Sequence, residues 1–76
     1  MMSNHRVIDA LARRLNELDE EISQMQEDFD KAEALNSQDS VVQGYLGVIS
    51  GLIHMKQVER TNVYQDYVSL VNAEFD

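Results

Sequence analysis

The sequence predicts an all-α protein, an antiparallel helical hairpin of two long helices that dimerises into a four-helix bundle. Three observations predict this fold class. The first half of the chain repeats apolar residues every seven positions, a short polar segment follows at 36–40, and the 76 residues include no proline. A seven-residue apolar repeat places one stripe along a helix. A chain without proline has nothing that forces a break inside a helix.

The first predicted helix covers about residues 4–35. Its apolar stripe is spaced alternately by three and four residues: Ile8, Leu11, Leu15, Leu18, Ile22, Met25, Phe29 and Ala32. Asn36 follows, and asparagine tolerates the left-handed conformation that ends many helices. A lone helix of about 30 residues, about 45 Å long, would leave this stripe in water. The stripe must therefore pack against another helix, as in a coiled coil.

The turn at 36–40 is short and rich in residues that bond their own backbone. The second predicted helix covers about residues 41–74. Ser40 and Gln43 fit a capping box, which favours a helix over the strand that the Val and Ile content of 41–53 would also suit. A five-residue connection between long helices favours an antiparallel hairpin. In that hairpin, residue i lies opposite about residue 76 − i.

This register predicts close helix packing at three glycines of the second helix. The expected neighbours are Ala32 for Gly44, Phe29 for Gly47 and Met25 for Gly51. Glycine inside a helix costs about 1 kcal/mol relative to alanine, so a close approach would explain all three. The same register brings Lys56 near Glu20 and Arg60 near Glu17. Such cross-helix ion pairs would fix the alignment more than the stability.

The second helix has more apolar surface than one partner helix can cover. One stripe contains Leu46, Ile49, Ile53, Tyr64, Tyr67 and Val71, and another contains Val48, Leu52 and Met55. A two-helix hairpin leaves one stripe in water, and contiguous exposed apolar patches mark binding surfaces. We therefore expect a partner or oligomer interface at six residues: Val48, Leu52, Met55, Tyr64, Tyr67 and Val71.

The net charge of −8 is concentrated in one segment, residues 16–39, which hold nine carboxylates and one lysine. Six of the carboxylates form a predicted acidic face: Glu17, Glu20, Glu21, Glu27, Asp28 and Asp30. Such a surface repels phosphate backbones and anionic lipid headgroups, so we expect neither nucleic acid nor membrane as a partner. A basic groove on another protein is compatible with it, although acidity often serves only solubility.

No residue pattern predicts catalysis, a cofactor or a metal site. His5 and His54 lack the HExxH or Glu-x-x-His arrangement of zinc and di-iron sites, and the acidic cluster at 28–33 lacks the glycine and glutamate spacing of a calcium loop. The absence of cysteine excludes disulfides and fits a reducing, cytoplasmic location. No apolar segment reaches the ~20 residues of a membrane span, and no signal peptide is expected. We expect no enzyme, no cofactor and no small-molecule substrate.

The sequence thus predicts a non-enzymatic protein–protein interaction module, a single domain over residues 1–76. We expect it to form a homodimer or higher homo-oligomer, to bind another protein, and to act as an adaptor, a small chaperone-like protein or an assembly component. Two alternatives stay open. One is an acidic decoy or inhibitor that occupies a basic groove of a target protein, and the other is a subunit of a helical homopolymer.

Overall fold

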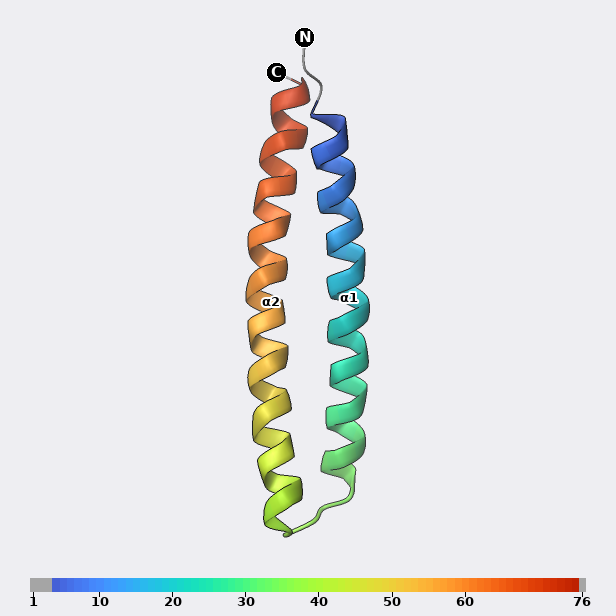
Figure 1. The fold of residues 1–76 in the computed structure, drawn as a ribbon, viewed down its shortest axis with the longest axis vertical. Coiled ribbons are helices and arrows are strands. Elements are labelled where there is room, and N and C mark those ends of the chain that lie inside the picture. The colour runs from blue at the N-terminus through green and yellow to red at the C-terminus, as the bar shows by residue number, and fades with distance from the viewer. Residues whose placement is uncertain (1–3, 76) are drawn as a thin grey trace.

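The protein is a rod of two antiparallel helices, as a computed structural model that describes residues 4–75 shows (Figure 1). α1 spans His5–Ala34 and α2 spans Ser40–Phe75. They lie side by side along their length, in a molecule of 60 × 14 × 14 Å. The described residues contain no strand. The predicted all-α hairpin is confirmed, and each helix begins and ends within one residue of its predicted bounds.

α1 packs on α2 through the predicted seven-residue stripe. Leu15 and Leu18 are buried, and Leu18 has no exposed surface. The other members of the stripe are half-buried: Ile8, Leu11, Ile22, Met25, Phe29 and Ala32. A single neighbouring helix therefore accounts for the whole apolar repeat of α1.

Asn36 ends α1 in the way the sequence predicts, with a φ of 48° in the left-handed region. The last turn closes through two backbone hydrogen bonds. Leu35 N–H donates to the Ala32 carbonyl at 3.2 Å, and Asn36 N–H donates to the Glu33 carbonyl at 3.0 Å. The chain then reverses through residues 36–39 and enters α2.

Asp39 caps the start of α2, so the capping box predicted for Ser40 and Gln43 is wrong. The Val41 N–H donates to Asp39 Oδ1 at 2.8 Å, and the Gln43 N–H donates to the Asp39 carbonyl at 3.0 Å. The Gln43 side chain donates instead to the Ser37 carbonyl at 2.7 Å, which ties the helix back to the turn. A carboxylate at a helix N-terminus also gains from the helix dipole, which a serine hydroxyl does not.

Four polar cross-helix pairs define the register: Asn4 with Glu74, Arg14 with Glu59, Asp19 with Arg60, and Glu21 with Lys56. The two residue numbers of each pair add to between 73 and 79. The predicted register is therefore confirmed.

The ion pairs of Lys56 and Arg60 exist, but the predicted partners Glu20 and Glu17 are wrong. Lys56 pairs with Glu21 and Arg60 pairs with Asp19. Positions 19 and 21 flank the buried stripe of α1 on its two sides, whereas Glu20 lies on the far side of the helix and is exposed. Glu17 pairs along α1 with Arg14.

The seam of α2 is apolar at both ends and charged in the middle. It follows a repeat of four and three residues whose members are all buried or half-buried: Val42, Leu46, Ile49, Ile53, Lys56, Arg60, Val63, Tyr67 and Leu70. In the described part of the chain, the buried side chains are Leu15, Leu18, Ile49 and Ile53. So small a core supplies only a few kcal/mol, and domains of this size often need a further source of stability.

Candidate interaction surface

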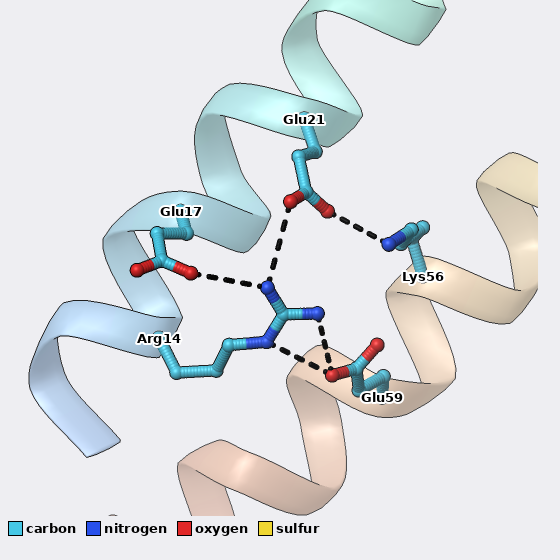
Figure 2. A network of polar contacts seen from close by, with 5 residues as sticks. All are labelled: Arg14, Glu17, Glu21, Lys56 and Glu59. Carbon is cyan, nitrogen blue, oxygen red and sulfur yellow. Dashed lines mark hydrogen bonds and ion pairs between the residues drawn. The ribbon is translucent and has the colours of Figure 1, made fainter. Parts of the chain in front are cut away.

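A network of five charged side chains joins the helices near the middle of the hairpin (Figure 2). Arg14 of α1 donates through Nε and Nη2 to Glu59 Oε2 of α2, at 3.0 and 2.8 Å. Its Nη1 lies 3.2 Å from Glu17 Oε2 and 3.5 Å from Glu21 Oε1. The Lys56 Nζ lies 2.8 Å from the buried Glu21 Oε2. Each cation thus contacts at least one carboxylate across the seam.

The network shifts the titration of two of its members, Glu21 and Arg14, toward their charged forms. The close contact with Lys56, together with the charges of Lys56 and Arg14, lowers the pKa of Glu21. The hydrogen bonds to Glu59 and Glu17 raise the pKa of Arg14. Because the side chains stay partly exposed to water, the network contributes more to the alignment of the helices than to stability.

The Glu21 carboxylate is expected to make the hairpin sensitive to acid. Its pKa is lower in the folded than in the unfolded chain, so the ionised group stabilises the fold above about pH 4.3, the ordinary glutamate pKa. That stabilisation is lost as the pH falls through the lowered, folded-state pKa. Compared with wild type, Glu21→Gln should melt at a lower temperature near pH 6 and lose less stability on acidification to about pH 3.

Circular dichroism melts across this pH range test the expectation, with Glu20→Gln as the matched control. Glu20 is an exposed carboxylate one position away, so its variant should follow the wild-type profile. An equal acid-induced loss in all three proteins would show that the contact between Glu21 and Lys56 contributes nothing to stability.

The other flank of the seam carries a second ion pair. Arg60 donates to Asp19, and this hydrogen bond raises the pKa of Arg60. The guanidinium carbon of Arg60 also lies 5.9 Å from the centroid of the Tyr64 ring, within the range of a cation–π contact. Tyr64 is nevertheless 49% exposed.

The first half of α2 exposes a second apolar stripe, named here the outer stripe: Val41, Tyr45, Val48, Leu52 and Met55. Their exposed fractions run from 43% at Leu52 to 78% at Val41. Each member precedes a seam position by one residue, so the outer stripe lies about 100° around the helix from the seam. Residues 40–55 include no Asp, Glu, Lys or Arg. The outer stripe is therefore a continuous, uncharged surface that α1 does not cover.

The six predicted interface residues divide between this surface and the hairpin itself. Val48, Leu52, Met55 and Tyr64 are exposed. Tyr67 and Val71 are half-buried on the α1 side of α2, so the hairpin already uses part of their surface. A partner contact at any of the six stays a prediction.

The predicted packing of Gly44, Gly47 and Gly51 against α1 is wrong. All three glycines are exposed, and a Cβ built at any of them meets no atom within 4 Å. They lie one residue before Tyr45, Val48 and Leu52, about 100° beyond the outer stripe. This position turns them away from α1, and nothing inside the hairpin requires them.

Most of the predicted acidic face is engaged in contacts within the hairpin. Glu17 and Glu21 contact Arg14, Glu27 pairs with Lys31 at 3.0 Å, and Asp28 and Asp30 accept hydrogen bonds at 3.0 Å from Gln24 and Gln26. The Glu27 contact raises the pKa of Lys31. Glu20 is exposed. The acidic face is thus largely a set of local pairs along α1.

Two open grooves continue the exposed apolar surface along the rod. The first is lined by Leu52, Met55, Val58 and Val63 together with Lys56, Glu59, Asn62 and Asp66. The second is lined by Val7, Leu11, Ser69 and Leu70, and it shares Asp66 with the first. The charged network in Figure 2 therefore borders the outer stripe through Lys56 and Glu59.

Sequence reasoning missed several members of this surface. Val41, Tyr45 and Val58 are exposed, at 78%, 45% and 47%, yet were not among the predicted interface residues. The first two carry a usable signal, because each comes one residue before a seam position. The bridging role of Arg14 was also missed, since a flanking arginine looks like any surface cation until the register is known.

No family model, curated protein or solved structure matches this chain. Within residues 4–75, no group of three or more His, Cys, Asp or Glu side chains could hold a metal ion. Neither described helix combines the length and apolar character needed to cross a membrane.

Proposed function

We propose that this chain is a non-enzymatic protein–protein interaction module that self-associates through the outer stripe and serves as a small adaptor or assembly component. The observation that carries the proposal is the exposed outer stripe, whose members are spaced alternately by four and three residues. It lies within a stretch of 16 residues, 40–55, that includes no Asp, Glu, Lys or Arg. Contiguous apolar surface of this kind is typical of binding sites.

The small core supports the same proposal. The four side chains that are buried among the described residues give the hairpin little stability of its own, whereas a partner on the outer stripe would bury several more large side chains. Binding that favours the folded state stabilises it in proportion to partner concentration. Folding and association are therefore coupled in this proposal.

An acidic decoy is the less supported alternative. Its binding would need free carboxylates, but Glu17, Glu21 and Glu27 already contact cations of the same chain. A decoy would bind its target far more weakly in high salt, because exposed charges are screened. Association through the uncharged outer stripe has no such dependence.

Leu52→Glu should dissociate the assembly, because it places a carboxylate in the middle of the outer stripe. Sedimentation velocity over a range of protein concentrations measures the result. The matched control is Gln57→Glu, which adds the same charge at an exposed position on the other side of α2. We expect the control to associate as wild type does and Leu52→Glu to sediment as a monomer.

The same measurement distinguishes the other outcomes. A wild-type protein that is monomeric at every concentration contradicts self-association. A sedimentation coefficient that keeps rising with concentration would identify an open homopolymer, since a closed dimer reaches a plateau. Circular dichroism of each variant confirms that the helices remain.

A further inference from the structure

We infer that the outer stripe binds the outer stripe of a second copy, antiparallel, about a two-fold axis at Val48. This inference rests on the proposed self-association and names its geometry. It starts from the spacing of the outer stripe, which is four, three, four and three residues from Val41 to Met55. The stripe is therefore symmetric about Val48 to within one residue, as an interface between identical surfaces requires.

An antiparallel two-fold at Val48 places large side chains at matching heights. Val41 of one copy lies level with Met55 of the second copy, Tyr45 lies within one residue of Leu52, and Val48 meets itself. Leu35 and Val58, exposed by 69% and 47%, lie just beyond the two ends of this overlap. The contact thus engages the five large apolar side chains of the outer stripe.

The same symmetry accounts for the glycines. Gly44 of one copy lies within one residue of the height of Gly51 of the second copy, on the edge of the contact that faces away from α1. Without side chains there, the two α2 backbones can approach closely, as in small-residue helix contacts. Within the hairpin these glycines have no packing role, and each costs about 1 kcal/mol of helix stability relative to alanine.

The carboxylates of α2 favour the antiparallel over the parallel arrangement. Beyond Met55, the register of the outer stripe continues into Glu59, Asn62 and Asp66, which line the first groove. A parallel dimer would place Glu59 and Asp66 against the same residues of the second copy. The antiparallel overlap ends near Met55, so these carboxylates lie beyond the α2 helix of the second copy.

The arrangement places the acidic segments of the two copies at the same height, because Asp28 of α1 lies opposite Val48 in the hairpin register. The outer stripe lies about 100° around α2 from the seam, so the two-fold axis places both α1 helices on the same side of the α2–α2 contact, a little farther apart than the two α2 helices. Their separation exceeds that of the two α2 helices and approaches or exceeds a Debye length of about 8 Å at physiological salt. Added salt should therefore leave the dimer intact or strengthen it.

The available surface suits a small dimer. The five side chains of the outer stripe, with exposed fractions from 43% to 78%, together offer several hundred Å² on each copy. A standard interface buries roughly 800 Å² per partner. The dimer is thus expected to form and dissociate with concentration rather than to be permanent.

Single cysteine variants test the geometry cleanly, because the chain has no cysteine of its own. Val48→Cys should form a disulfide-linked dimer on mild oxidation, since the two copies of this position meet at the axis. Val41→Cys alone and Met55→Cys alone should not, because each lies about 21 Å from its own counterpart. When Val41→Cys and Met55→Cys are mixed and allowed to exchange subunits before oxidation, they should cross-link, because these two positions lie level in the proposed dimer. A control variant, Gln57→Cys, should not cross-link.

Small-angle scattering gives an independent readout. Antiparallel overlap of residues 41–55 extends the particle from 60 Å to about 90 Å at 1.5 Å per residue. A parallel dimer would stay near 60 Å, and its three outer-stripe cysteine variants would each cross-link with themselves.

Either parallel result would overturn the inferred axis and leave self-association standing. A protein that sediments as a dimer but yields no cross-link at any of the three positions would overturn both the axis and the outer stripe as the interface. If the wild-type protein stays monomeric, the proposed self-association itself is contradicted, and not only the geometry of the dimer.

Discussion

Leu18→Ala is expected to unfold the hairpin. Leu18 is the fully enclosed side chain of the core, with no exposed surface. Truncating a buried leucine to alanine costs about 2–5 kcal/mol, through lost burial and the cavity that remains. A core of this size supplies roughly 3–5 kcal/mol in total. The variant should therefore lose most of its helical signal by far-ultraviolet circular dichroism near 25 °C.

Leu35→Ala is the matched control, because it makes the same chemical deletion at a side chain that is 69% exposed. Its melting curve in dilute solution, where the monomer dominates, should stay close to wild type. If association stabilises the fold, raising the protein concentration should partly restore the helices of Leu18→Ala. A Leu18→Ala protein that melts within a few degrees of wild type would show that the core lies elsewhere.

The sequence predicts α1 almost completely, because one partner helix accounts for its entire apolar pattern. Every member of the stripe from Ile8 to Ala32 is buried or half-buried. The turn is equally local, since Asn36 adopts the left-handed conformation that its residue type allows. Together these two features determine the register of the hairpin to within a few residues.

The errors arise where one residue position changes the direction of a side chain by about 100°. The crude register placed Glu20 beside Lys56, but only positions 19 and 21 point along the flanks of the seam. Resolving such choices needs the rotation of each helix, which sequence spacing alone does not give.

The surface of α2 was harder to predict because three repeats overlap in its first half. The seam, the outer stripe and the glycines occupy consecutive positions, as in Gly44, Tyr45 and Leu46. Any of the three could face α1 on spacing alone. Volume excludes the glycines, which would leave the seam empty, but it does not separate the outer stripe from Leu46, Ile49 and Ile53, which fill the seam.

Replacing all three glycines, in Gly44→Ala/Gly47→Ala/Gly51→Ala, should have opposite effects on folding and on association. In the hairpin each new methyl group meets no atom within 4 Å, so only the helix propensity changes, by about 1 kcal/mol per site. The triple variant should therefore gain about 3 kcal/mol in unfolding free energy, or roughly 10–20 °C in melting temperature for a small domain. Its dimer should be weaker, because the methyl groups keep the two α2 helices apart.

A second set of variants in the Leu52→Glu background separates the two effects, because that background is expected to be monomeric. There the triple alanine change should show the full rise in melting temperature with nothing lost to association. In the wild-type background, sedimentation should show a higher dissociation constant for the dimer. An unchanged dissociation constant would place the glycines outside the contact, whereas a monomer that gains no stability would mean that a Cβ is not free there. If the glycines serve the contact with a second α2 helix rather than the hairpin, the triple variant must show both a higher unfolding free energy and a weaker dimer.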